Sequence, residues 1–259
     1  MTELDVAVAA AHAAARVIAE TGPLAVQHKG TFDLVTQADV TAEQAIRRVL
    51  TEHTPDIAIL GEEGGGGATA STRWVVDPID GTTNFVHGVP HYGISIALEV
   101  DGEPVVGVIH NPSRQELYRA AKGQGAWLGD ERLAVSGVRE LSDALCATGF
   151  SVDRTQVETP LALHAAVLKA CHGMRRFGAA SLDLAFVARG VFDAYFERTL
   201  SRWDVAAGIV LVREAGGRVE ALPGHGLGDR PAPLATNGWL HDALHSLIEA
   251  TLREQGEQP

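Results

Sequence analysis

Apolar and polar residues are arranged with helical spacing at the start of the chain. This spacing holds over residues 3–21, where a glycine-proline pair ends the segment. It returns over residues 40–53, where Asp39 or Thr41 is the expected helix cap. The pattern therefore predicts two amphipathic helices before the first strand.

Short apolar segments separated by glycines and tight turns come next, and they predict strands. The Asp101-Gly102 pair is typical of a hairpin turn between two of them. Pro78 has no backbone N–H, so we expect the strand before it to break there rather than continue in the middle of a sheet. The predicted strands cover residues 57–60, 74–76, 91–100, 104–110, 117–121 and 126–128.

From about residue 144 the pattern changes to strands that alternate with helices. Strands are expected at residues 144–148, 173–177, 192–197, 217–221 and 232–236, and helices at residues 157–170, 180–189, 203–215 and 239–254. A meander followed by this alternation predicts an α/β protein of the layered α+β kind, an αβαβα sandwich. We expect an antiparallel-sheet N-terminal sub-domain over residues 1–138 and a mixed-sheet α/β C-terminal sub-domain over residues 139–259.

Composition and charge exclude several classes of protein. The 259 residues are 46% hydrophobic, which is enough for a sizeable core, and the formal net charge of -12 repels a nucleic-acid backbone. No stretch has eighteen uninterrupted apolar residues, and the N-terminus lacks the basic start of a signal peptide. Cys146 and Cys171 could pair, but free thiols in a reducing cytosol are the expectation. We therefore predict a cytoplasmic protein with no nucleic-acid or membrane partner.

Residues 74–85 (WVVDPIDGTTNF) hold the densest group of chemically active side chains. An apolar strand leads into Asp77 and Asp80, and Gly81 then permits a tight turn and the close approach of another backbone group. Residues 82–84 (TTN) resemble a helix start, whose free N–H groups favour an anion. One short segment could thus offer carboxylates to a cation and backbone donors to a phosphate.

Two further acidic positions have the same character. Glu62 ends an apolar strand beside the glycine run at residues 64–67, and Asp204 begins a helix rich in small residues. If these carboxylates meet Asp77 and Asp80, their repulsion favours a bound cation, and hard oxygen ligands suit Mg²⁺ or Mn²⁺. The residues alone leave ordinary alternatives open: a proline turn, a solvated loop and a helix cap. The glycine run is either a mobile lid or a plain flexible loop.

Three motifs, in this order and spacing, resemble those of the inositol monophosphatase family. They are residues 61–63 (GEE), 74–88 (WVVDPIDGTTNFVHG) and 203–208 (WDVAAG), with support from residues 33–39 (DLVTQAD), 123–126 (GQGA) and 178–183 (GAASLD). The agreement extends over nearly the whole chain. It implies a magnesium-dependent phosphatase.

The resemblance also implies a role for each site residue. One metal ion would be surrounded by Glu62, Asp77, the carbonyl of Ile79 and Thr82. A second ion would be held by Asp77, Asp80 and Asp204. A third, more weakly bound ion would lie near Glu62. The catalytic residues would be Glu62, Thr82 and Asp39, with Asp39 accepting a hydrogen bond from the Thr82 hydroxyl. The Gly81 and Thr82 amides would receive the phosphate, Ala180 and Glu197 would contact substrate hydroxyls, and Lys29 would lie at the rim.

The function expected from this resemblance is the hydrolysis of a small sugar- or polyol-phosphate monoester. Inositol monophosphate is the first choice, with two to three Mg²⁺ ions (Mn²⁺ being possible) and in-line attack by a metal-activated water. Histidinol phosphate, fructose bisphosphate and a nucleotide 3'-phosphate are the alternatives. The resemblance further implies lithium sensitivity and a homodimer. A regulatory binding protein on a phosphatase scaffold is the alternative from a different class.

Overall fold

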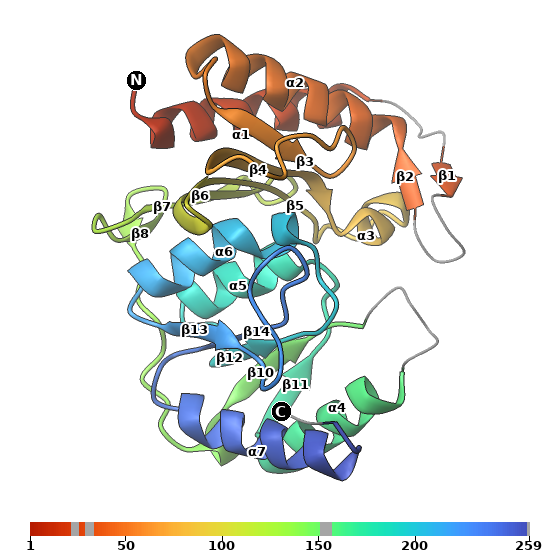
Figure 1. Cartoon of the computed structure of the whole chain (residues 1–259), viewed down its shortest axis with the longest axis vertical. Helices are drawn as coiled ribbons and strands as arrows, with labels where there is room; N and C mark the ends of the chain where they lie inside the picture. The colour runs from red at the N-terminus through yellow and green to blue at the C-terminus, as the bar shows by residue number, and fades with distance from the viewer. Residues whose placement is uncertain (22–25, 29–33, 151–156, 258–259) are drawn as a thin grey trace.

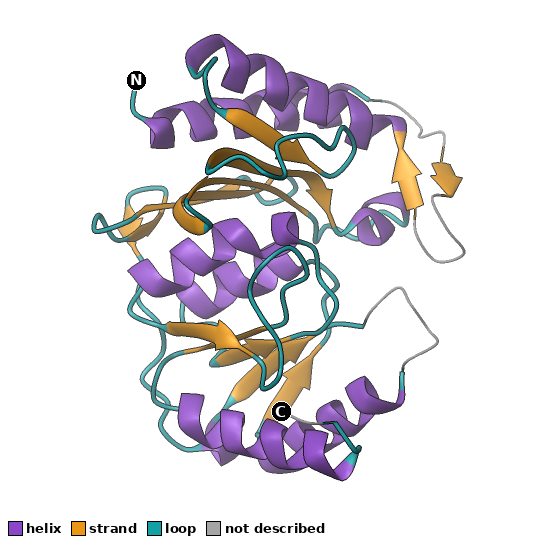
Figure 2. Ribbon diagram, in the orientation of Figure 1, coloured by secondary structure: helices purple, strands orange, loops and turns teal. Residues whose placement is uncertain are grey.

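The computed structural model describes residues 1–21, 26–28, 34–150 and 157–257, and its elements stack in five layers (Figures 1 and 2). Two helices cover the outer face of a seven-stranded sheet, two lie between that sheet and a five-stranded one, and two cover the far side of the second sheet. In this order, the pairs are α1 (Glu3–Glu20) with α2 (Gln37–His53), α5 (Ala180–Ala188) with α6 (Arg202–Glu214), and α4 (Glu158–Ala170) with α7 (His241–Glu254). The predicted αβαβα sandwich is confirmed.

The first sheet follows the chain in strand order. Its strands are β3 (Ala58–Gly61), β4 (Thr72–Asp80), β5 (Gly93–Val100), β6 (Glu103–Asn111), β7 (Glu116–Ala121), β8 (Ala126–Leu128) and β9 (Glu131–Arg132). All neighbouring pairs are antiparallel except β3 with β4, which is parallel, so the sheet is mixed at its first edge. Helices pack on both faces of β4 to β6, which explains their nearly continuous burial.

The second sheet is mixed, as predicted. Its order is β11 (Gly173–Arg175), β10 (Leu145–Thr148), β12 (Ala194–Phe196), β14 (Pro233–Thr236) and β13 (Arg218–Ala221). The pairs that include β10 are parallel, and the pairs that include β14 are antiparallel. The remaining elements are the β1 (Val26–His28) and β2 (Leu34–Thr36) ribbon, the short helix α3 (Thr82–Val86) and the 3-10 helix η1 (Leu141–Asp143).

The largest core cluster lies around α5 and α6 and draws on both sheets. It joins Val75 and Ile109 of the first sheet to Tyr195 and Ala235 of the second through the two central helices. The two halves therefore share a buried core. The division into sub-domains at residue 138 stays a prediction.

The start of α2 and the end of β4 differ from the sequence expectations. The cap of α2 is Thr36, and Asp39 lies inside the first turn, where it forms a capping box with Thr36. Strand β4 continues through Pro78 to Asp80, so the expectation that Pro78 would end the strand was wrong. The proline is tolerated because the β4–β5 register shifts between Asp77 and Asp80, and because β3 pairs no further than Val76.

Two of the composition-based expectations can be compared with the structure. Cys146 and Cys171 are both free, with Cys146 buried and Cys171 half-buried. Among the described residues, no helix combines the length and the apolar character needed to cross a membrane.

Candidate metal and phosphate site

The end of β4 places two aspartates at the seam between the first sheet and the central helices. Asp77 lies opposite Ser95 of β5, and its Oδ1 accepts a hydrogen bond of 2.9 Å from the Ile79 amide. Asp80 is the last residue of the strand. Gly81 follows as the N-cap residue of α3, with a φ of 89° that would be strained for a residue with a side chain. A Cβ at this position would also lie 3.1 Å from the Gly178 carbonyl, so the turn is closely packed.

Helix α6 brings Asp204 to the same place from the other half of the chain. Asp204 is the third residue of the helix, where its carboxylate accepts a hydrogen bond of 2.7 Å from the Ser201 amide in a capping box. One carboxylate oxygen from each of Asp77, Asp80 and Asp204 can lie within 4.8 Å of the other two. The helix cap was therefore not the whole explanation of Asp204, because three carboxylates from two distant segments converge.

Glu62 approaches this cluster from the end of β3. Its amide donates a hydrogen bond of 3.2 Å to the Val76 carbonyl, directly before Asp77, and its carboxyl group is among the neighbours that raise the pKa of Asp77. The following residues are held by the buried Glu43 of α2, which accepts hydrogen bonds from the amides of Glu63 at 2.7 Å and Gly64 at 2.9 Å. The start of the glycine run is thus anchored to a helix.

Burial raises the pKa of all three aspartates, and acidic neighbours raise it further at Asp77 and Asp204. The pKa of Asp77 lies well above its usual range because it is buried and because Glu62, Asp80 and Asp204 are acidic neighbours. Burial raises the pKa of Asp80 to about 6, although hydrogen bonds from Ser181 and the Ala180 backbone lower it in part. Burial, followed by the charge of Asp80, raises the pKa of Asp204 well above its usual range. A divalent cation would relieve this repulsion, and the all-oxygen donor set fits Mg²⁺ or Mn²⁺.

Thr82 connects the cluster to helix α2. Its hydroxyl is 3.3 Å from Asp39 Oδ1 and 3.1 Å from the Ile79 carbonyl, and can donate to either. The other oxygen of Asp39 accepts hydrogen bonds from the Thr36 amide at 2.8 Å and hydroxyl at 2.6 Å. Asp39 is buried, and burial raises its pKa despite these hydrogen bonds. The Asp39–Thr82 contact expected from the family resemblance is therefore present.

The two residues assigned to substrate hydroxyls come from the C-terminal half of the chain, and Ala180 lies beside Asp80. Ala180 begins α5, and the next residue, Ser181, donates both its amide, at 2.7 Å, and its hydroxyl to Asp80 Oδ2. Glu197 directly follows β12 and accepts a hydrogen bond of 2.6 Å from the Tyr195 hydroxyl. Burial raises the pKa of Glu197 to about 7, and Asp80 is among the charges that act on it. Lys29 lies outside the described residues.

Sequence reasoning gave no role to two residues that shape the site. Ser181 holds Asp80, and Glu43 holds the segment after Glu62. A signal for Glu43 existed, because it follows Asp39 by four residues and therefore lies on the same face of α2. Ser181 gave no such signal, since its partner is 101 residues away in the sequence.

His91 packs among aromatic side chains next to the site. Its ring contacts the rings of Phe177 and Phe186, and its Nε2 lies 3.9 Å from Asp183 Oδ1. Burial lowers its pKa to about 4, so the ring is neutral. This histidine is a packing residue beside the site.

Comparisons with known proteins agree with this geometry. The family model described as "Inositol monophosphatase family" matches residues 1–257. A Caulobacter vibrioides protein named "Inositol-1-monophosphatase" is 42% identical over 255 residues, covering 95% of this chain and 99% of the relative. A Pseudomonas aeruginosa protein named "Nus factor SuhB" is 44% identical, with 96% of each chain covered.

A solved structure is similar over almost the same length. The extragenic suppressor protein suhB from Bartonella henselae superposes with a TM-score of 0.89 at 41% identity, covering 95% of this chain and 97% of the other. The comparison of sequences and the comparison of structures thus identify the same group of related proteins.

Proposed function

The chain belongs to the inositol monophosphatase family and is a phosphatase, and we propose that its substrate is inositol monophosphate and its cofactor Mg²⁺. The observation that carries the proposal is the meeting of Asp77, Asp80 and Asp204, whose carboxylate oxygens lie within 4.8 Å of one another. Three buried aspartates with raised pKa values, with Glu62 as an acidic neighbour, are costly to keep together without a cation.

The donor set fits two or three Mg²⁺ ions, with Mn²⁺ as a substitute. Glu62, Asp77, the Ile79 carbonyl and Thr82 would hold one ion; Asp77, Asp80 and Asp204 a second; and Glu62 a third through water. When bound, such ions lower the pKa of a coordinated water and neutralise charge on phosphoryl oxygens.

The chain's own groups can hold the attacking water and take up its proton. The Thr82 hydroxyl can donate its proton in a hydrogen bond to the Asp39 carboxylate, and Asp39 is held in place by Thr36. Burial raises the pKa of Asp39, which makes its carboxylate a better proton acceptor than an exposed one. We assign Glu62, Thr82 and Asp39 to the orientation and deprotonation of this water.

The substrate would lie between the two halves of the site. The Gly81 and Thr82 amides open the turn after β4 and would receive the phosphate oxygens. The backbone at Ala180 and the carboxylate of Glu197, both near Asp80, would contact hydroxyl groups of the polyol. A polyol ring rich in hydroxyl groups can donate hydrogen bonds to the Glu197 carboxylate, which is a hydrogen-bond acceptor.

A phosphate-release panel tests the substrate. Purified protein with Mg²⁺ would be assayed on inositol 1-phosphate, histidinol phosphate, fructose 1,6-bisphosphate and adenosine 3',5'-bisphosphate, with EDTA as the control. We expect the highest kcat/KM for inositol 1-phosphate and no turnover in EDTA. A higher kcat/KM for another compound of the panel would identify that compound as the preferred substrate in place of inositol 1-phosphate. Turnover in EDTA would contradict the proposed metal dependence.

Two further properties belong to the same proposal. We propose inhibition by millimolar lithium, tested by adding LiCl or KCl at equal concentration to the Mg²⁺-dependent assay. We also propose a homodimer, tested by light scattering on the eluting gel-filtration peak. Inhibition by KCl to the same extent as by LiCl would contradict the lithium sensitivity. A mass equal to one chain would contradict the homodimer.

A second candidate function follows from the name of one relative. The Pseudomonas protein is named a Nus factor, which keeps open a regulatory binding role on a phosphatase scaffold. Turnover on no panel member, with Mg²⁺ bound, would favour this role over catalysis.

A further inference from the structure

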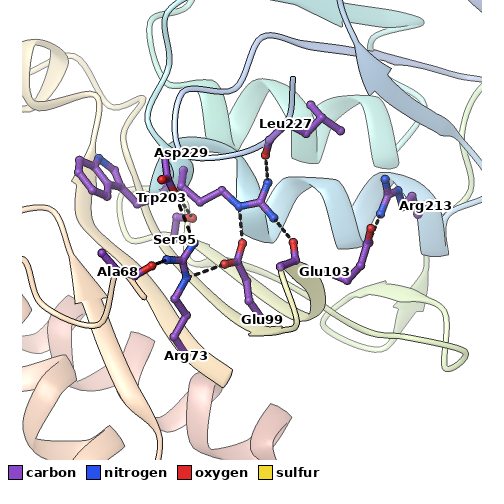
Figure 3. A network of polar contacts seen from close by, with 11 residues as sticks. Ala68, Arg73, Ser95, Glu99, Glu103, Trp203, Arg213, Leu227 and Asp229 are labelled. Carbon is purple, nitrogen blue, oxygen red and sulfur yellow. Dashed lines mark hydrogen bonds and ion pairs between the residues drawn. The ribbon is translucent and has the colours of Figure 1, made fainter. Parts of the chain in front are cut away.

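Strand β5 contacts the first turn of α6 through two polar side chains on one face (Figure 3). Ser95 and Glu99 are four residues apart, so they point to the same side of the strand. The Ser95 hydroxyl donates a hydrogen bond of 2.9 Å to the Trp203 carbonyl, one residue before Asp204. The Glu99 carboxylate accepts a hydrogen bond from Arg202 Nε, two residues before Asp204.

Ser95 therefore links two metal-ligating segments directly. On the β4 side it is the register partner of Asp77, and on the α6 side it holds the residue that precedes Asp204. It is almost completely buried, at 1% exposure, so no solvent competes for its hydrogen bond. A change at Ser95 would therefore act on the separation of Asp77 and Asp204.

Glu99 extends this link to a third segment. Its second oxygen accepts a hydrogen bond of 2.9 Å from Arg73 Nε, and Arg73 Nη1 donates one of 2.5 Å to the carbonyl of Ala68 (Figure 3). Ala68 closes the glycine-rich segment that begins after Glu62. One carboxylate thus joins the segment after Glu62 to the start of α6.

The remaining donors of Arg202 fix its guanidinium from the other side. Its Nη2 donates a hydrogen bond of 2.9 Å to the carbonyl of Gly102, and its Nη1 donates to that of Leu227. Glu99, Arg73 and Arg202 are all buried, so the charge of Glu99 is needed to hold the two guanidinium groups together.

We propose that Ser95 and Glu99 are positioning residues, which set the placement of Asp204 and Glu62 relative to Asp77 and so determine the affinity for divalent cations. The inference rests on the proposed metal site. Neither side chain is a proposed ligand. Ser95 contacts the backbone next to Asp204, and Glu99 acts through the side chains of Arg202 and Arg73, as outer-shell partners of metal sites do.

The test is Mn²⁺ binding to the full chain, measured by electron paramagnetic resonance of the free ion, with no substrate present. For Ser95→Ala we expect the Mn²⁺ dissociation constant to rise about tenfold, in the range seen for outer-shell changes. The Mg²⁺ midpoint of phosphatase activity should rise in parallel, and excess Mg²⁺ should restore most of the turnover. This variant removes no charge, so it should fold.

Glu99→Gln and Glu103→Gln form the matched pair. Glu99→Gln should weaken Mn²⁺ binding at least as much as Ser95→Ala, because it also releases the Ala68 segment. Glu103→Gln breaks an exposed ion pair with Arg213 in the same region (Figure 3) and should leave Mn²⁺ binding unchanged. Where Glu99→Gln does not fold, Ser95→Ala alone decides.

The outcomes distinguish a failure of the positioning role from a failure of the proposed metal site. Wild-type Mn²⁺ affinity in Ser95→Ala would overturn the positioning role, even if its melting temperature falls. An equal loss of affinity in Glu103→Gln would also overturn it. If the wild-type chain itself binds no Mn²⁺, the proposed metal site fails and the positioning role fails with it.

Discussion

At the scale of single residues, Asp80 is the proposed metal ligand that a serine of the other half of the chain holds in place. It is buried, accepts two hydrogen bonds from Ser181 and lies beside Asp204. For Asp80→Asn we expect kcat to fall by at least about 100-fold, as for the loss of a group that stabilises charge in the transition state. The fold should persist, because the amide oxygen can still accept a hydrogen bond from Ser181.

Steady-state kinetics at saturating Mg²⁺, with a melting curve, measure this effect. Ser181→Ala is the control, because it removes one hydrogen bond from Asp80 and keeps the carboxylate charge. Its kcat should stay within about tenfold of wild type. Turnover close to wild type in Asp80→Asn would exclude Asp80 from the metal site.

Glu197 gives a prediction on pH. Its pKa in the fold is about 7, against an ordinary value of 4.5, so the folded chain holds a proton in this window that the unfolded chain has lost. The free energy of unfolding therefore falls as pH rises from 4.5 to 7, and Glu197→Gln should lack this part of the slope. Across the window, the wild type should lose roughly 2 kcal/mol relative to the variant.

Urea unfolding in EDTA at several pH values checks this difference. EDTA removes the influence of divalent ions on the neighbouring carboxylates. Parallel pH profiles for the wild type and Glu197→Gln would contradict the raised pKa.

The sequence could reveal a site residue only where the residue stands in a recognisable motif or where its contact partner is close in the sequence. Asp77 and Asp80 stand in one dense motif, so their chemistry was visible, whereas their contact with Asp204 rested on the family resemblance. Ser181 and Ser95 act through partners more than 100 residues away, which no local pattern reports.

At the scale of elements, α6 depends on close packing against α5. A Cβ placed on Gly208 would lie 2.5 Å from Leu184 Cβ and from its Cδ1. The clash includes Cβ, so a rotamer change of Leu184 cannot relieve it, and the two helices would have to separate.

Gly208→Ala should therefore destabilise the protein although alanine favours helices. The gain in helix propensity is about 1 kcal/mol. The cost of overpacking is about 1–3 kcal/mol. We expect a net loss of about 1 kcal/mol in the free energy of unfolding, measured by urea unfolding, from these two terms.

Gly137→Ala is the control, because no atom lies within 4 Å of its added Cβ, and it should be neutral or slightly stabilising. Equal stabilisation by both substitutions would show that the helices do not pack this closely.

The sequence predicted most element positions correctly, and two of its errors have different origins. Hydrophobic spacing located the helices and strands because burial is periodic. It missed the passage of β4 through Pro78, because that depends on the pairing with another strand. It also placed the start of α2 too late, although the capping box at Thr36 is a local feature that the spacing of apolar residues does not report. Thr36 caps α2 in a box with Asp39, and Pro78 is accommodated by a register shift against β5.

At the scale of the whole molecule, the proposed metal site joins the two halves of the chain. Asp77 and Asp80 belong to the first sheet, whereas Asp204 belongs to α6, which lies between the two sheets. An unfolded chain cannot bring these carboxylates together, so a cation that binds them binds the folded state alone. Mg²⁺ should therefore stabilise the entire fold by mass action.

At a Mg²⁺ concentration 100 times its dissociation constant, this stabilisation is about 2.7 kcal/mol. For a chain of this length, Tm should rise by about 5–10 °C. Asp204→Asn should abolish most of the rise, because it removes the ligand contributed by the second half. Asp242→Asn is the control, since Asp242 is an exposed residue of α7 paired with Arg218, and it should keep the full rise. Calorimetry in MgCl₂, against NaCl of equal ionic strength, makes the comparison. An equal rise in Asp204→Asn and wild type would mean that Mg²⁺ binds elsewhere, and that the two halves are held together by their shared core alone.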